Sequence, residues 1–200
     1  MRLRFSVILG LLLVLGLYAA PGASGDDAAE AVFAGGCFWC MQPPYDDVDG
    51  VHDTEVGFTG GHVEDPTYQE VIQGGTGHYE ALRITYDPER ISYAELLDIF
   101  WRNVDPLDAG GQFCDRGDHY RAAIFVADDG ERALAEASKE ALENAGRFDQ
   151  PIVTEILDAG SFYLAEEYHQ DYYKKNPLRY RFYRASCGRD GRLEELWGES

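Results

Sequence analysis

An α+β fold is what the sequence predicts: a two-layer α/β sandwich in which helices pack against one mixed β-sheet. Segments with the apolar pattern of strands lie among amphipathic helical segments, without the strict alternation of a doubly wound parallel sheet. The chain of 200 residues contains no internal repeat, no low-complexity tract and no long linker. We therefore expect a single domain with one hydrophobic core.

Period-two alternation marks the clearest strand. Leu82, Ile84 and Tyr86 are separated by Arg83 and Thr85, which is typical of a strand with one face buried. Further strands are expected in short apolar or β-branched runs, at residues 31–34, 51–58, 121–126 and 153–157.

Two helices begin at recognisable capping residues. Ser92 and Glu95 form a capping box ahead of residues 93–103, whose apolar side chains recur at helical spacing. Asp128 begins a second amphipathic helix that extends to about Asn144. We expect both helices to bury one face against the sheet.

The last quarter of the chain contains one further predicted helix. Residues 162–175 are expected to be helical and to stop at Asn176 and Pro177, because proline does not continue a helix. From Leu178 onward the sequence is rich in arginine and tyrosine, and we predict an irregular C-terminal tail.

Residues 1–25 have the pattern of a signal peptide. Arg2 and Arg4 give a basic start, residues 7–17 are apolar, and small residues follow. Cleavage would leave residues 26–200 as the folded domain, exported to the periplasm or secreted. The alternative is an uncleaved N-terminal anchor, although the apolar run is short for a transmembrane span.

Acidic residues dominate the charge of the chain. Asp and Glu number 36 against 17 Lys and Arg, for a formal net charge of −19. Nucleic acids and anionic lipids attract clustered positive charge. We therefore expect no nucleic-acid partner, and we attribute the charge to solubility.

Four cysteines bear on the chemistry: Cys37, Cys40, Cys114 and Cys187. An even number in an exported protein is typical of structural disulfides. A chain of this length with 45% hydrophobic residues does not need them to fold. The number of cysteines therefore leaves structural pairing and redox catalysis equally open.

Cys37 has the most informative surroundings. It follows a predicted strand and two glycines, Gly35 and Gly36, which places it at a turn leading into a helix. The free N–H groups and the positive dipole end of a helix stabilise an anion, so we expect a lowered thiol pKa. Pro43 and Pro44 require that this helix kink or restart.

Two other interpretations of the cysteines stay open at this point. Cys37 and Cys40 could be the dithiol of a thiol–disulfide oxidoreductase, or the four cysteines could form two structural disulfides in a non-enzymatic domain. A zinc site would need a second C-x-x-C pair or a tight Cys/His cluster. Cys114 and Cys187 lie far apart in the sequence, so no metal site is expected.

Short motifs follow one another along most of the chain. They are GGCFW (35–39), GFTGG (57–61), DPTY (65–68), GHYEA (77–81), YDP (86–88), DRG (115–117), HQDY (169–172) and NP (176–177). In this order they resemble the peptide methionine sulfoxide reductase A family. The resemblance extends from about residue 31 to residue 197, and a whole ordered set is far more specific than GGCFW alone.

The resemblance implies catalytic roles at five positions. Cys37 would attack the sulfoxide sulfur and become a sulfenic acid. Glu80 would protonate the sulfoxide oxygen, which Tyr68 and Tyr120 would hold by hydrogen bonds, and Asp115 matches an active-site aspartate. Since only the protonated acid can donate, we expect burial to raise the pKa of Glu80.

Substrate binding and recycling are also implied. Phe38 and Trp39 match the aromatic walls that hold the S-methyl group of the substrate. A second thiol must then convert the Cys37 sulfenic acid to an intramolecular disulfide. Cys114, next to the active-site aspartate, is our first candidate for this resolving cysteine, with Cys187 as a relay or second resolver.

The resemblance further implies a ferredoxin-like core and the S-epimer of methionine sulfoxide, free or in oxidised proteins, as substrate. No bound cofactor is expected, and a thioredoxin-like disulfide reductant would supply the electrons. We expect a monomer. Cys40 departs from the commonest family pattern, which has glycine there.

Overall fold

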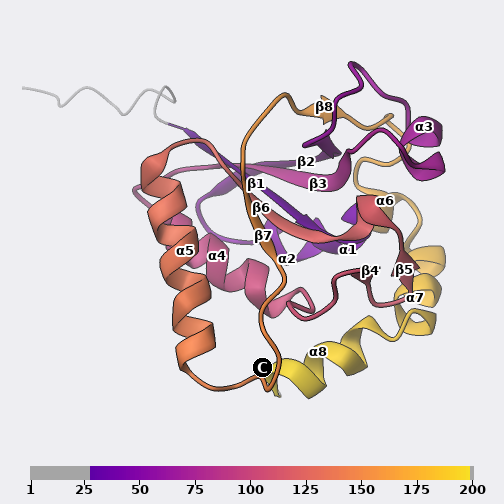
Figure 1. Cartoon of the computed structure of the whole chain (residues 1–200). Coiled ribbons are helices and arrows are strands. Elements are labelled where there is room, and N and C mark those ends of the chain that lie inside the picture. The colour runs from indigo at the N-terminus through magenta and orange to yellow at the C-terminus, as the bar shows by residue number, and fades with distance from the viewer. Residues whose placement is uncertain (1–27, 199–200) are drawn as a thin grey trace, which may run out of the picture.

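The computed structural model describes residues 28–198 (Figure 1). The predicted signal peptide, residues 1–25, lies outside the described residues. Among the residues that the structure does describe, no helix is long and apolar enough to cross a bilayer.

One mixed sheet of six strands forms the centre of the fold. Its strands are β1 (Ala29–Gly35), β2 (Val51–Thr59), β3 (Tyr79–Tyr86), β6 (Ala122–Val126), β7 (Glu155–Asp158) and β8 (Tyr163–Leu164). Their order across the sheet is β7-β6-β1-β3-β2-β8; β6 and β7 are parallel, and all other neighbours are antiparallel. The central order β6-β1-β3-β2 is that of a ferredoxin-like core, so the predicted α+β fold class is confirmed.

The described part of the chain also contains eight α-helices. They are α1 (Phe38–Met41), α2 (Pro43–Asp46), α3 (Tyr68–Gln73), α4 (Tyr93–Arg102), α5 (Asp129–Asn144), α6 (Tyr172–Lys175), α7 (Pro177–Ser186) and α8 (Arg189–Trp197). A small hairpin, β4 (Gly111–Gln112) with β5 (Asp115–Arg116), leads into a 3-10 helix, η1 (Asp118–Tyr120).

The main core lies between one face of the sheet and the helices. The long helices α4 and α5 lie side by side on this face (Figure 1). Phe33 of β1 packs on Phe100 of α4 with ring centroids 5.2 Å apart, and Ala135 of α5 joins the same cluster. On the opposite face, Phe162 packs against a smaller cluster around Phe125. The helices thus form a single layer, as a two-layer sandwich requires.

Alternation along β3 decides where its side chains point. Leu82 and Ile84 belong to the main core, while Tyr79 and Ala81 face the opposite side. Since side chains two apart in a strand share a face, Glu80 points to the same side as Leu82, beneath the helices. The strand therefore carries a carboxyl group into an apolar layer.

Capping residues define the starts of two helices. Ser92 and Glu95 form the predicted capping box at the start of α4. Thr67 and Glu70 form a second capping box, which begins α3 and which the sequence prediction missed. The restart predicted at Pro43 is observed, because α1 ends before it and α2 begins there.

The prediction of a helix over residues 162–175 was wrong, apart from its last turn in α6. This segment instead runs alongside β2. The backbone N–H of Ala165 donates to the carbonyl of Val56 at 3.0 Å, and the side chain of Gln170 bonds both polar backbone groups of Val56. The backbone of this segment bonds to the edge of the sheet and not within a helix. The helical spacing of its apolar residues could not reveal that β2 would compete for these hydrogen bonds.

The prediction of an irregular C-terminal tail was also wrong, because residues 177–197 form α7 and α8. Pro177 occupies the first turn of α7, where backbone N–H groups have no partner within the helix, so the absence of an N–H in proline costs no hydrogen bond. Arg189 of α8 is 1% exposed and donates to the carbonyls of Gly35 and Asn103 at 3.1 and 2.6 Å. A buried arginine thus fastens the tail to the end of β1.

Candidate active site

Cys37 lies where β1 turns into α1, as the N-cap residue of that helix. Gly36 before it has φ +82°, and a Cβ there would lie 2.5 Å from the Cβ of Gln112, so the turn requires glycine. The Cys37 side chain is 6% exposed. The turn therefore sets a buried thiol at the start of a helix, as the sequence predicts.

Glu80 lies directly beside the start of the same helix. Its carboxylate accepts a hydrogen bond from the backbone N–H of Phe38 at 3.1 Å. Burial raises the pKa of Glu80 to about 8, against the opposing effect of that hydrogen bond. The carboxyl group therefore holds a proton at neutral pH, which is the form that the sequence prediction required.

Burial also determines the pKa of the Cys37 thiol. It raises the pKa of Cys37 well above the usual value, and contacts with Cys40 and the charge of Glu80 act in the same direction. A hydrogen bond from Tyr183 lowers this pKa but does not compensate. The expectation of a lowered thiol pKa was thus wrong for the site without substrate, because four residues of helix offset little of the desolvation.

The structure brings Tyr68 and Tyr120 to this pair from two separate elements. Tyr68 is the first residue of α3 and Tyr120 ends η1. Burial raises the pKa of Tyr68 to about 12, and the charges of Glu80 and Cys37 add to the effect. Burial and Glu80 likewise raise the pKa of Tyr120. Both phenols therefore stay protonated and able to donate hydrogen bonds beside the thiol and the acid.

Aromatic side chains surround the thiol. Phe38 is buried and lies between Phe58 and His169, whereas Trp39 is only half-buried. Trp39 stacks on Tyr172 with ring centroids 3.7 Å apart, and its indole N–H donates to His169 at 3.0 Å. Stacking and hydrogen bond together fix the indole plane at the edge of the site.

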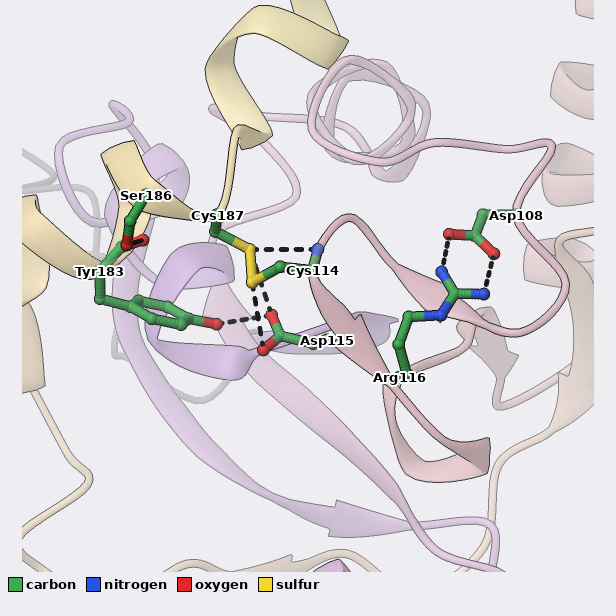
Figure 2. Close-up of a disulfide and its surroundings, with 7 residues drawn as sticks. All are labelled: Asp108, Cys114, Asp115, Arg116, Tyr183, Ser186 and Cys187. Carbon is green, nitrogen blue, oxygen red and sulfur yellow. Dashed lines mark hydrogen bonds and ion pairs between the residues drawn. A yellow bond between two sulfur atoms is a disulfide. The ribbon is translucent and has the colours of Figure 1, made fainter.

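A disulfide closes the other side of the site. Cys114 and Cys187 are bonded to each other, with their Cα atoms 5.0 Å apart, while Cys37 and Cys40 are free. Figure 2 shows the side chains of Tyr183 and Asp115 pointing toward one another beside this disulfide. The Tyr183 hydroxyl donates to the Asp115 carboxylate at 2.5 Å. Tyr183 therefore connects the free thiol to the disulfide region.

Three site residues escaped the sequence prediction: His169, Tyr172 and Tyr183. His169 and Tyr172 belong to the HQDY motif, which was noted for the resemblance but given no function. Tyr183 precedes Cys187 by four residues on α7, a spacing that has meaning only on a helix. Because the tail was predicted to be irregular, the spacing of Tyr183 and Cys187 carried no meaning in the sequence.

One cluster of possible metal ligands lies within residues 28–198. Cys114, Asp115 and Cys187 place their ligand atoms within 4.8 Å of one another. Because the two sulfurs are joined in the disulfide, neither is a thiolate available to a metal in this state. The cluster is therefore a redox site in this state and not a metal site.

A buried free thiol, a proton-bearing acid and a neighbouring disulfide favour redox chemistry at sulfur. The fold and the site thus define a thiol-dependent oxidoreductase. Residues 29–200 match the family model described as "Peptide methionine sulfoxide reductase". The chain therefore belongs to the peptide methionine sulfoxide reductase family.

Individual relatives agree with this assignment. The chain is 55% identical over 168 residues to "Peptide methionine sulfoxide reductase MsrA" of Bacillus licheniformis, which covers 84% of this chain and 93% of the relative. The structure of Mxr1 from Saccharomyces cerevisiae in reduced form is 32% identical, with a TM-score of 0.70 over 77% of this chain and 88% of that one. Mxr1 in complex with Trx2 gives a TM-score of 0.50 at 25% identity, over 74% and 87% of the two chains.

Proposed function

We propose that this protein reduces the S-epimer of methionine sulfoxide, free and within oxidised proteins, to methionine. Each epimer of this sulfoxide has its own enzyme, and family membership favours the S form here. The observation that carries the proposal is the pairing of Cys37 with Glu80, a buried thiol beside an acid that keeps its proton at neutral pH.

The first step is an attack on sulfur. The Cys37 sulfur bonds to the sulfoxide sulfur while Glu80 donates its proton to the oxygen, which is a poor leaving group without protonation. Tyr68 and Tyr120 donate hydrogen bonds to the same oxygen, and Trp39 with Phe38 contacts the methyl group of the substrate. The oxygen, with the proton from Glu80, then passes to Cys37, giving a sulfenic acid and methionine, and the proton that the Cys37 thiol loses restores Glu80.

Thiol recycling completes the cycle. The oxidising equivalent of the sulfenic acid ends on the Cys114–Cys187 pair, one of whose members, Cys114, is exposed. A thioredoxin-like protein then reduces this disulfide, a role supported by the complex of Mxr1 with Trx2. Asp115 and Tyr183 hold the pair beside the site.

The cellular setting follows from the N-terminal pattern. We propose that residues 1–25 direct export, so that the enzyme works as a monomer in the periplasm or outside the cell and repairs oxidised proteins there. Detection of the N-terminus of the mature protein tests this. A start near residue 26 supports cleavage, and an intact Met1 on a membrane-bound protein contradicts it.

The reaction is tested with separated epimers. Reduced protein mixed with the S form should yield methionine, whereas the R form should be a far poorer substrate. Cys37→Ser should lower single-turnover methionine formation by several orders of magnitude, because an alcohol is a far weaker nucleophile than a thiolate. Equal use of both epimers, or an active Cys37→Ser protein, contradicts the proposal.

A further inference from the structure

The indole ring of Trp39 is held by two residues to which the proposed reaction assigns no role. Tyr172 stacks on it with ring centroids 3.7 Å apart and an interplanar angle of 7°. The indole N–H donates to Nδ1 of His169 at 3.0 Å. A stack alone lets a ring turn in its own plane, whereas a directional hydrogen bond at its edge stops that rotation. The bond to His169 therefore determines where the edge of the indole lies.

Aromatic rings hold the imidazole of His169 in turn. Its centroid lies 4.3 Å from that of Tyr68, 5.1 Å from that of Phe38 and 4.1 Å from that of Tyr168. His169 is 1% exposed. Tyr68, Phe38 and Trp39 are the side chains to which the proposed reaction assigns contacts with the sulfoxide group, and His169 touches all three.

The segment that carries His169 is fastened to α3 and to the sheet. The backbone N–H of His169 donates to the carbonyl of Glu166 at 2.8 Å, and the Glu166 carboxylate accepts the backbone N–H of Tyr68 at 3.1 Å. The next residue, Gln170, bonds both polar backbone groups of Val56 on β2. The imidazole therefore has a rigid support, which a residue needs if it is to position another side chain.

The protonation state of His169 suits a hydrogen-bond acceptor. Burial lowers the pKa of His169 to about 4, against the opposing effect of the Glu166 charge. A neutral imidazole has one nitrogen with a free lone pair and one nitrogen that carries a proton. Since Nδ1 accepts the indole N–H, the proton lies on Nε2.

The proton on Nε2 makes this histidine costly to the fold. Nε2 is buried and has no hydrogen-bond partner among residues 28–198. A buried donor without an acceptor lowers the stability of a protein. An apolar ring of similar size would avoid this cost, so stability does not account for a histidine at this position, whereas the acceptor at Nδ1 does.

We propose that His169 is a positioning residue, whose Nδ1 holds the indole of Trp39 in the orientation that the S-methyl group of the substrate requires. It acts through Trp39 and does not touch the reacting atoms. The inference rests on the proposed function, in which Trp39 contacts the methyl group. A sulfoxide sulfur displaced by about 1 Å from its place beside Cys37 reacts about 10²-fold more slowly, so a small rotation of the indole has a large effect.

Two substitutions separate the acceptor from the ring. His169→Phe keeps an aromatic ring but removes Nδ1, whereas His169→Asn places a side-chain oxygen close to the position of Nδ1. In single turnovers of the reduced protein with methionine S-sulfoxide, we expect His169→Phe to lower the second-order rate constant by about 10²-fold and His169→Asn to remain within about threefold of wild type. The melting temperature of His169→Phe should equal or exceed that of wild type, because the unpaired buried donor is gone.

Ser138→Ala is the matched control. The Ser138 hydroxyl, on α5, accepts the indole N–H of Trp101, on α4, at 2.9 Å. Trp101 is 3% exposed, so the loss of this acceptor should lower the melting temperature. The rate constant for the sulfoxide should not change. Loss of the Trp101 bond should thus weaken the fold, and loss of the Trp39 bond should slow the reaction.

A double variant tests whether His169 acts through Trp39. In a Trp39→Phe protein the bond is already absent, so adding His169→Phe should change the rate constant by less than about twofold. The nuclear magnetic resonance signal of the Trp39 indole N–H should move in His169→Phe and stay near its wild-type position in His169→Asn.

Three results overturn the inference. A wild-type rate constant in His169→Phe shows that the bond is not needed. Effects of Trp39→Phe and His169→Phe that multiply in the double variant show that His169 does not act through Trp39. A lowered melting temperature in His169→Phe, with no rescue of the rate by His169→Asn, makes the role of His169 structural. In all three cases the wild-type protein still forms methionine; if the reduced wild-type protein forms none, the proposed function itself is overturned.

Discussion

Glu80 is an ionisable residue in the apolar core, and its position there follows from the alternation of side chains along β3. The alternation of β3 directs it beneath α1, and burial there raises its pKa to about 8. The acid is consequently protonated below pH 8 and ionised above it. A single carboxyl group therefore links the pH dependence of the reaction to the stability of the fold.

The substitution Glu80→Gln removes the proton donor but keeps an acceptor for the Phe38 N–H. We expect single-turnover methionine formation to fall by about 10²–10⁴-fold, the usual contribution of a general acid. In the wild-type protein the rate should decline as the pH rises through about 8, where Glu80 loses its proton. Glu80→Gln should lack this decline. Glu55→Gln, on neighbouring β2, is the matched control and should keep it. If the decline persists in Glu80→Gln, the titrating group is not Glu80.

The stability of the fold should also decline as the pH rises. The folded-state pKa of Glu80 lies above its ordinary value of 4.5, so the unfolded chain loses this proton first as the pH rises. Between pH 4.5 and 8 the wild-type protein therefore loses stability relative to Glu80→Gln, by about 3 kcal/mol at pH 7 as an upper limit. Urea unfolding at pH 4 and pH 7 checks this; an equal difference at the two values contradicts the assignment.

At the scale of elements, short helices position the side chains of the site. Tyr68 begins α3, and that helix has six residues held by the Thr67–Glu70 capping box. An isolated helix of this length does not form in water, so its cap and its tertiary contacts must hold it. The backbone N–H of Tyr68 adds a bond to Glu166 at 3.1 Å.

Two caps provide a matched comparison. Thr67→Ala and Ser92→Ala each remove an N-cap and should each lower the free energy of unfolding by about 1 kcal/mol. Only Thr67→Ala loosens the helix that carries Tyr68, so only this variant should lower the single-turnover rate. Equal rates in the two variants would show that the cap of α3 does not position the tyrosine.

Local signals predicted some elements and missed others for a physical reason. Alternation and a capping box identified β3 and α4, because each pattern is complete within its own segment. The segment 162–175 follows β2 through hydrogen bonds to a strand more than 100 residues earlier. Residues 177–197 become two helices around the buried Arg189, whose partners are likewise distant. Contacts of this range leave no local period in the sequence.

At the scale of the whole molecule, the reactive thiol and acid lie on one side of the site and the disulfide lies on the other. β1, β3 and α1 supply the thiol and the acid, while the β4–β5 hairpin and the end of α7 supply the disulfide. Motif resemblance selected Cys37, Glu80 and both tyrosines, which the structure brings together. The sequence did not show that the two remote cysteines, 73 residues apart, would bond to each other.

The disulfide should also stabilise the fold as a whole. Its 73-residue separation corresponds to about 4 kcal/mol in the chain-entropy model, as an upper limit. Reductant should therefore lower the urea midpoint of the wild-type protein. The double variant Cys114→Ser/Cys187→Ser should unfold at the lower midpoint with or without reductant, and a midpoint that still responds to reductant there assigns the effect to another bond.

One measurement tests the central claim, that Cys37 takes oxygen from the S-sulfoxide and passes the oxidation outward to the disulfide. Fully reduced protein receives one equivalent of either epimer, and methionine and the cysteine linkages are quantified after quenching. We predict about one methionine per protein from the S form, accompanied by the Cys114–Cys187 disulfide and free Cys37, and little from the R form. Methionine formed without oxidation of any cysteine, or formed equally from both epimers, would contradict the account.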